Sequence, residues 1–442
     1  METKKIPVAH KSGMLKTYKI FTKNPLQFLC EKATNDSGIS QFNLLHYRIV
    51  HFTHPEFIRH VLTDSEGKYT QSRDRDHMKL LFGDGLLTSS GKHWQKQRNM
   101  IQPCFGMPQM EKLFAGITKQ INNFPVPVGD KTDIHQFSLD LVNRIIAEVI
   151  FSDASDEILE IGNVLVTLKT DTLARLSDFA LPLWMPTTRN SAFKKQRSFV
   201  CESIRKLIVA RKASAQKPDD LLTFFLRAKD KQTGEVMSEK ELTEELLGVY
   251  AAAHEPVAIA LSYVFFLLAN HPQHVELLGE ELSHVLNGGE ISMENFRGLV
   301  YNKQVVQETL RLYPPVWVSG KRALQDDVIN GYRIKKNDNI IFSPLLIHRH
   351  PSFWKNPDEF DPDRFAPGKE RNAFAYIPFS GGTKHCVGSH LAMMILQLVL
   401  AKTTAEVSME TTAKKIEINP FTTLKPLEQL SFRVSKRRKC CN

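Results

Sequence analysis

One segment limits what this chain can fold into more than any other: residues 246–269, with the sequence LLGVYAAAHEPVAIALSYVFFLLA. A helix of this length and composition is long enough to span a bilayer. However, His254, Glu255 and Pro256 stand at its centre, and an ionised carboxylate is costly in the middle of a membrane. We therefore expect a buried helix that crosses the centre of a large soluble protein, without a transmembrane anchor.

The rest of the pattern predicts a mainly α protein with a minor β part. Residues 1–70 mix short alternating runs with turn residues, whereas residues 90–310 are mostly helical in pattern. The sequence SEKE at 238–241 predicts a capping box that begins the long apolar helix. Further expected elements are a helix over residues 302–313 that ends at two prolines, a hairpin over 326–344, a helix over 389–407 and strands near the C-terminus.

Composition and charge narrow the class of protein. No linker or repeat interrupts the pattern, so we expect one domain over residues 1–442, with 435–442 as a basic, frayed tail. The chain has 58 basic and 48 acidic residues, and its formal charge of +10 favours an acidic partner such as an electron-transfer protein, an anionic ligand or a membrane surface. No motif indicates nucleic-acid binding. The six cysteines are too few for a disulfide scaffold and the N-terminus has no apolar core of signal-peptide length, which predicts a cytoplasmic protein.

Three glycines surround one cysteine in the sequence FSGGTKHCVG, residues 379–388. Glycine allows close approach of the backbone, and the basic neighbours Lys384 and His385 favour a thiolate. On this spacing alone, Cys386 is either a thiolate ligand or a buried structural cysteine in a turn.

The loop resembles the haem-binding loop of the cytochrome P450 family, F-x-x-G-x-x-x-C-x-G, with Phe379, Gly382, Cys386 and Gly388 at the fixed positions. The resemblance implies that Cys386 is the axial thiolate ligand of the iron in one haem b. It also implies that Phe379 and Gly388 line the cofactor. Most of the family has arginine or histidine where this chain has Lys384, which would pair with a haem propionate as a point charge.

A second motif, ETLR at residues 308–311, resembles the family's E-x-x-R helix, and the sequence FDPDRF supplies Arg364 as its companion. In the family these charges form a buried network that holds the haem loop. The resemblance therefore implies a structural role for Glu308, Arg311 and Arg364. The run HRHPSFW, residues 348–354, also resembles the family's sequence before this segment.

A third motif, WQKQR at residues 94–98, resembles the family's W-x-x-x-R, whose residues contact the haem propionates. A spacing of four places Trp94 and Arg98 on one helix face. Arg322 stands where the family has another propionate-binding arginine. A solvated basic helix face is the alternative interpretation of Trp94 and Arg98.

The resemblance implies the family's triangular prism-like fold, with haem between the long central helix and the helix after the cysteine loop. The central helix of the family normally reads A-G-x-(D/E)-T, and its acid and threonine relay protons to bound dioxygen. Here Ala253 replaces the glycine that lies against haem, Glu255 keeps the acid and Pro256 replaces the threonine. We expect Glu255, with His254, to handle protons through water or a substrate hydroxyl. A structural salt bridge is the alternative explanation for Glu255.

The implied activity is O₂-dependent monooxygenation, hydroxylation or epoxidation, of a lipophilic small molecule by a monomeric enzyme. Electrons would come from a separate ferredoxin with its reductase, or from a flavoprotein. Because Pro256 has no hydroxyl, a peroxide-driven oxygenase and an isomerase or dehydratase are alternatives; fatty-acid peroxygenases with proline here carry arginine before it, whereas this chain has Glu255. A non-catalytic haem-binding sensor is the alternative from another class. Apolar segments expected to face a substrate are residues 78–87, 179–186, 316–318 and 421–423.

Overall fold

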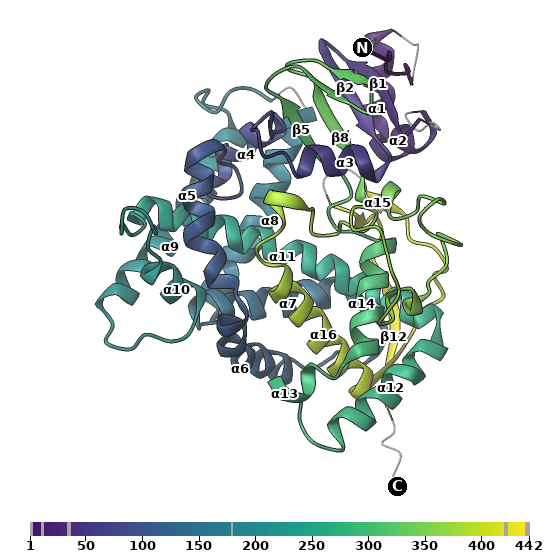
Figure 1. Cartoon of the computed structure of the whole chain (residues 1–442). Helices are drawn as coiled ribbons and strands as arrows, with labels where there is room; N and C mark the ends of the chain where they lie inside the picture. Colours follow the sequence, from purple (N-terminus) through teal and green to yellow (C-terminus); the bar gives the residue numbers. More distant parts are fainter. Residues whose placement is uncertain (1–2, 10–12, 33–36, 178–179, 420–422, 438–442) are drawn as a thin grey trace. The chain divides into compact units, whose positions relative to one another are not determined.

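The structure, a computed structural model, describes residues 3–9, 13–32, 37–177, 180–419 and 423–437. The chain forms two compact units, each assembled from three stretches of sequence (Figure 1). The first unit comprises Met1–Arg73, Gln307–Cys386 and Ile416–Leu427. The second comprises Asp74–Val306, Val387–Lys415 and Glu428–Asn442.

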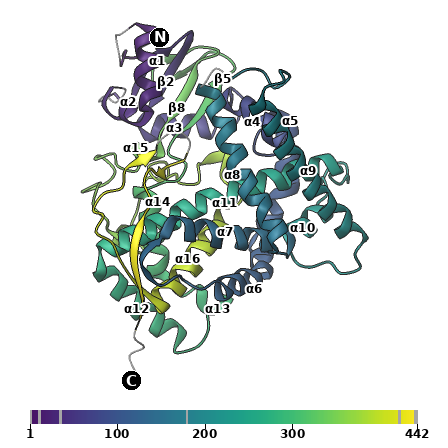
Figure 2. The same cartoon turned by 180° about the vertical axis from the view of Figure 1, so that it is seen from behind.

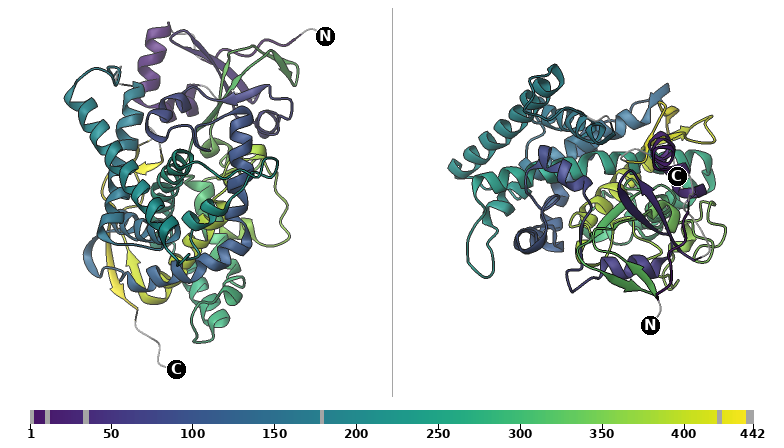
Figure 3. Two further views of the ribbon diagram at one scale, coloured as in Figure 1. Left: turned by 90° about the vertical axis from the view of Figure 1, so that its left-hand side faces the viewer. Right: turned by 90° about the horizontal axis from the view of Figure 1, so that it is seen from above.

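The first unit is built on a five-stranded sheet with the strand order β1-β2-β8-β5-β3. Strands β2 and β8 pair in parallel, and the other neighbours are antiparallel. Figure 3 shows the purple N-terminal strands beside green strands that come from the middle of the chain. The strands are β1 (Ile39–Leu44), β2 (Tyr47–Phe52), β8 (Asn339–Phe342), β5 (Ser319–Ala323) and β3 (Tyr69–Gln71).

Apolar side chains of this sheet and of the helix after β2 form one core, in which Val50, Phe52, Ile340 and Phe342 are fully buried. The hairpin predicted over residues 326–344 is confirmed for residues 327–334, where β6 and β7 pair. Residues 339–342 form β8 instead, which pairs with β2 and β5. The remaining elements of the first unit are α1 (Met14–Lys23), α2 (Pro25–Lys32), α3 (Pro55–Leu62), β6 (Asp327–Ile329), β7 (Tyr332–Ile334), α15 (Pro344–Ile347), η2 (Pro362–Phe365), η3 (Gly382–Lys384), β10 (Ile418–Asn419) and β11 (Lys425–Pro426). Helix α14 (Val300–Leu312) begins in the second unit and ends in the first, just before the two prolines.

The second unit is mainly helical, as the pattern over residues 90–310 predicted. Its helices are α4 (Asp74–Phe82), α5 (Gly91–Ile101), η1 (Gln102–Phe105), α6 (Met107–Asn123), α7 (Ile134–Phe151), α8 (Asp156–Ser177), α9 (Thr188–Ala213), α10 (Leu221–Arg227), α11 (Glu239–Asn270), α12 (Pro272–Leu286), α13 (Met293–Phe296) and α16 (Ser389–Glu406). A small antiparallel sheet has the order β4-β12-β9. Its strands are β4 (Gly129–Asp133), β12 (Ser431–Lys436) and β9 (Val407–Glu410).

Helix α11 is the predicted long apolar helix, and it passes among α7, α8, α9 and α16 (Figures 1 and 2). The capping box is confirmed: Glu241 N donates to Ser238 Oγ at 3.3 Å, and Ser238 N donates to the Glu241 carboxylate at 2.8 Å. Among the described residues, α11 alone has the length and apolar character of a membrane span, but 83% of its most apolar window is buried inside the fold. This burial agrees with the expectation of an interior helix.

The predicted C-terminal tail begins later than expected. Ser435 pairs with Ser408 and Lys436 pairs with Val407, so the first residues of the expected tail form the end of β12. Strand pairing with β9 therefore orders these two residues. Their basic composition alone could not predict this pairing. Residues 438–442 lie outside the described part of the chain.

Candidate functional site

The E-x-x-R motif forms a fully buried ion pair in the first unit. Arg311 donates from Nε and Nη2 to the two carboxylate oxygens of Glu308, at 2.7 and 2.8 Å. Arg364 lies 3.3 Å from the same carboxylate. The three charges that the sequence indicated are therefore in one cluster, with the planar guanidinium of Arg311 in the bidentate geometry that lysine cannot reproduce.

Arg311 also fixes the loop that follows α15. Its remaining N–H groups donate to the carbonyl oxygens of His348, Pro357 and Glu359, at 2.8, 2.6 and 2.9 Å. In return, Asp361 N donates to Glu308 at 2.9 Å. Helix α14 and the loop of residues 348–361 are thus held by one buried network.

His348 extends this network toward the cysteine loop. The backbone N–H of Ile377 donates to His348 Nε2 at 2.8 Å, so Nδ1 carries the ring hydrogen and donates to the Arg311 carbonyl at 3.1 Å. Complete burial lowers the pKa of His348 to about 3, which keeps the ring neutral. The sequence placed His348 only in a run that resembled the family, and nothing in that run indicated this connection.

The cysteine loop is a tight turn in the first unit. Cys386 N donates to the Phe379 carbonyl at 3.0 Å, which closes the loop around η3. Gly382 has a φ of +61°, and a Cβ on it would lie 2.0 Å from the backbone oxygen of Leu62, so only glycine fits. Cys386 is exposed, whereas Cys104 and Cys201 are buried.

The first unit also offers a cation of the kind that a propionate needs. Arg322 lies on β5, paired in register with Thr70 of β3 and Asn339 of β8. Its Nε is buried and has no hydrogen-bond partner among the described residues. A buried N–H without a partner is costly, and an anionic group at this point would satisfy it. The exposed thiol of Cys386 therefore fits the role of iron ligand in haem. The Arg322 guanidinium fits the role of a propionate contact.

In the second unit, Trp94 and Arg98 lie on one face of α5, as their spacing predicted. The Arg98 guanidinium is 6.0 Å from the centroid of the Trp94 ring, and its Nε donates to Gln102 at 2.8 Å. Both side chains are half-buried. Gly388 is the N-cap residue of α16.

The centre of α11 leaves one stripe uncovered. Ala252 is exposed and Val249, Ala253 and Pro256 are half-buried, whereas nearly all other residues from 242 to 268 are buried. These four positions follow the i, i+3, i+4, i+7 pattern of a single helix face. They carry small or apolar side chains, as a face that lies against a flat apolar cofactor would require. Pro256 has no N–H, so the carbonyl of Ala252 loses its ordinary helix partner at this point.

Glu255 points away from this stripe and is paired. Lys169 Nζ of α8 lies 2.5 Å from its carboxylate, and the two side chains are only 14% and 10% exposed. A salt bridge is the expected alternative to proton transfer for Glu255, and its partner Lys169 was not predicted from the sequence. The proton-handling role of Glu255 stays a prediction.

His254 packs against α7. Its Nε2 donates to the carbonyl oxygen of Leu139 at 3.0 Å, and its ring stands edge-on to that of Tyr250. Burial lowers the pKa of His254, so the ring is neutral. These contacts favour a structural role, and the proton-handling role of His254 stays a prediction.

Two acidic residues that the sequence analysis did not single out hold the predicted substrate-facing segment 78–87. Glu245 of α11 is buried, and both oxygens of its carboxyl group lie within 3.0 Å of Leu86 N. Glu244 accepts a hydrogen bond from Asp84 N at 3.1 Å. Burial raises the pKa of Glu245 to about 8. Of the other predicted segments, Phe179, Phe421 and Thr422 lie outside the described residues.

Comparison with known proteins gives a consistent result. The family model described as Cytochrome P450 matches residues 12–432. The chain is 27% identical to cyclooctatin synthase of Streptomyces melanosporofaciens, over 86% of this chain and 85% of the relative. It is also 27% identical to cyclooctat-9-en-7-ol 5-monooxygenase of the same organism, over 86% and 84%, and 28% identical to pentalenene oxygenase of Streptomyces avermitilis, over 79% of each.

A solved structure, the cytochrome P450DA heme domain, superposes with a TM-score of 0.84 and covers 99% of both chains at 22% sequence identity. At this identity the likeness establishes the fold. The expected mainly α fold with a minor β part is confirmed.

Proposed function

The chain belongs to the cytochrome P450 family of monooxygenases, with haem as its cofactor, and from this premise we propose that it inserts one atom of O₂ into a C–H or C=C bond of a lipophilic small molecule. The second oxygen atom leaves as water, which consumes two electrons and two protons. The observation that carries the proposal is the exposed Cys386 in its glycine-bound turn, where Cys386 N donates to the Phe379 carbonyl. Just before this turn, Ile377 is hydrogen-bonded to His348, which is hydrogen-bonded to the buried Arg311.

Five side chains are proposed to hold the cofactor. Cys386 would be the ligand of the iron, and Arg322, Lys384, Trp94 and Arg98 would contact the haem propionates. Bound haem supplies an iron whose thiolate ligand favours O–O bond cleavage. The unsatisfied Nε of Arg322 supports this assignment.

Phe379, Gly388 and Ala253 are proposed to line the cofactor. The support for Ala253 is its place on the uncovered stripe of α11. Gly388 begins α16 directly after the cysteine loop, and the Phe379 carbonyl accepts the Cys386 N–H.

Proton delivery is proposed to start at Glu255. Pro256 cannot donate a proton, so the proton must cross from Glu255 by way of a water or a hydroxyl of the substrate. Lys169 holds the Glu255 carboxylate toward α8, so we propose that Glu255 takes up a proton from water and changes rotamer before each transfer. His254, held by Leu139, would position this part of α11.

The names of two relatives support a lipophilic substrate. One is named for pentalenene and another for cyclooctat-9-en-7-ol, and the second name denotes an alcohol. An alcohol substrate would supply the hydroxyl group that the helix lacks because Pro256 stands in place of the usual threonine.

The electron donor is proposed to be a separate acidic ferredoxin or flavoprotein that docks by charge on a monomeric, cytoplasmic enzyme. The support is the formal charge of +10. A hollow of about 270 Å³ beside α5 and η1 is lined by Lys112, Arg227, Lys229 and Lys231 without a lining carboxylate, which makes it the first surface to test. Complementary charge of this kind mainly raises association rates.

The proposal is tested with isotopically labelled dioxygen. The purified holoenzyme, a surrogate ferredoxin and its reductase are incubated under ¹⁸O₂ with a panel of terpenoid hydrocarbons and alcohols, and products are analysed by mass spectrometry. We expect one ¹⁸O atom in each product. Products that form without ¹⁸O would favour the isomerase or dehydratase, products that require added peroxide would favour the peroxide-driven oxygenase, and binding without any product would favour the sensor.

A further inference from the structure

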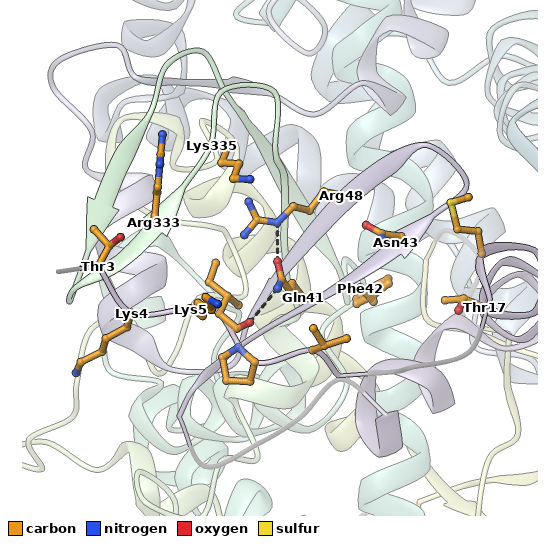
Figure 4. A pocket seen from close by; sticks show the side chains of 14 residues that line it. Thr3, Lys4, Lys5, Thr17, Gln41, Phe42, Asn43, Arg48, Arg333 and Lys335 are labelled. Carbon is orange, nitrogen blue, oxygen red and sulfur yellow. Dashed lines mark hydrogen bonds between the residues drawn. The ribbon is translucent and has the colours of Figure 1, made fainter.

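A hollow of about 820 Å³ lies in the first unit (Figure 4), and none of the residues assigned to haem lines it. The N-terminal segment forms one wall and is fixed by backbone hydrogen bonds. Lys4 N donates to the Gly331 carbonyl and Gln41 N donates to the Pro7 carbonyl, both at 2.8 Å. Gln41 adds a side-chain bond to the Ile6 carbonyl at 2.9 Å. The hollow is therefore a built feature of the sheet edge.

Every titratable residue that lines the hollow is basic. Arg48 pairs with Asp338 at 2.9 Å and Arg333 pairs with Asp326 at 2.8 Å. The lining residues with a positive charge are Lys4, Lys5, Arg48, Arg333 and Lys335.

Three of these charges have no carboxylate partner among the described residues: Lys4, Lys5 and Lys335. Lys4 points away from the centre of the hollow, with Nζ 5.6 Å from the centroid of the Tyr332 ring. In Figure 4 the side chains of Lys335 and Arg48 point into the same space. The buried carboxylate of Asp338 pairs with Arg48. An anion in this space would relieve the repulsion between like charges.

The rim of the hollow is apolar and exposed. Val8 and Met14 line it and are 53% and 55% exposed, and the next residue, Leu15, is 71% exposed. Leu15 is the second most exposed large apolar side chain of the described residues, after Trp184. Exposed apolar side chains beside unpaired cations suit an interface that is both anionic and oily.

We propose that this hollow binds the phosphate headgroup of an anionic phospholipid and thereby docks the first unit on a membrane surface. Lys5, Lys335 and Arg48 contact the headgroup. Val8, Met14 and Leu15 enter the boundary of the acyl chains. This peripheral contact is independent of haem binding and does not require a spanning helix.

The test measures cosedimentation of the full-length holoprotein with vesicles. Vesicles of phosphatidylcholine with about 30% phosphatidylglycerol are compared with phosphatidylcholine alone, since a basic side chain near an anionic surface contributes about 1 kcal/mol, or about fivefold in affinity. We expect binding to the anionic vesicles only. The double variant K5Q/K335Q should bind about 30-fold more weakly.

The matched control is K336Q/K369Q, which removes the same charge from two exposed lysines of the same unit that do not line the hollow. We expect the control to lose less than about threefold. A second variant, M14Q/L15Q, should bind at low salt but dissociate at lower salt than wild type does. Equal losses in the two lysine pairs, or equal binding to zwitterionic vesicles, would overturn the proposal.

A measurement with inorganic phosphate distinguishes a soluble anion from a lipid headgroup as the ligand of the hollow. If phosphate raises the melting temperature of wild type but not of K5Q/K335Q, and vesicles of either composition fail to bind, the hollow is a site for a soluble anion and the lipid proposal is wrong. Retained haem absorbance in all variants shows that the fold is intact.

Discussion

Replacement of Glu245 by glutamine tests how α11 holds the segment of residues 83–88. The Glu245 carboxyl group accepts the Leu86 N–H from a buried position, and burial raises its pKa to about 8 from an ordinary 4.5. Between pH 4.5 and 8 the folded protein therefore keeps a proton that the unfolded chain has already released. The contribution of this group to stability is complete below pH 4.5 and is lost as the pH rises to about 8.

The magnitude follows from that difference. At about 1.4 kcal/mol for each pH unit, the full loss is about 5 kcal/mol, of which about 4 kcal/mol falls between pH 5 and pH 8.5. For a chain of 442 residues, an unfolding entropy of about 2 cal/mol/K per residue converts this to a fall of about 4 °C in melting temperature.

Glutamine keeps an acceptor for Leu86 but cannot ionise. E245Q should therefore melt at the same temperature as wild type at pH 5 and about 4 °C higher at pH 8.5. The assay is thermal unfolding of the holoprotein by circular dichroism at half-unit pH steps. E239Q, at an exposed acid in the first turn of the same helix, is the matched control and should follow wild type. Parallel curves for wild type and E245Q over this pH range would refute the reasoning.

Three further outcomes are expected. E255Q should lower the product formed per electron pair by about 100-fold, whereas P256T should change it by less than about twofold. A large gain in P256T would mean that the native monooxygenase couples electron consumption poorly to product formation. No effect of either change would favour the isomerase or dehydratase. R311K should lose haem during purification, measured as the ratio of haem to protein absorbance, because lysine cannot reproduce the five hydrogen bonds of Arg311; full retention would contradict the role of the network. Reduction by an acidic ferredoxin should slow by about tenfold or more from about 50 to 500 mM salt, since exposed charges are screened, and a salt-independent rate would count against docking by charge.

Features that depend on neighbouring residues in the chain were readable from the sequence. The capping box at Ser238 and Glu241 is a local pattern, and so is the pair of Glu308 and Arg311, three residues apart on one helix. The apolar length of α11 and the prolines after α14 gave the positions of both helices to within a few residues.

Features that depend on packing between distant segments were not readable. Lys169 meets Glu255 because α8 lies on α11, and no spacing rule relates residues 86 positions apart. Glu245 sits in a helix turn with Glu241 and Glu244, which resembles a solvated acidic face, yet it is buried against Leu86. His348 connects Arg311 to Ile377 only because three segments meet there.

The central claim is that Cys386 is the thiolate ligand of haem iron, and the carbon monoxide difference spectrum of the reduced protein tests it most directly. Wild type should show the absorption band at the position typical of a thiolate ligand in this family. C386S should lose that band, while C201S, at a cysteine buried on helix α9, should keep it. An unchanged band in C386S would contradict the assignment of the ligand and with it the proposed chemistry.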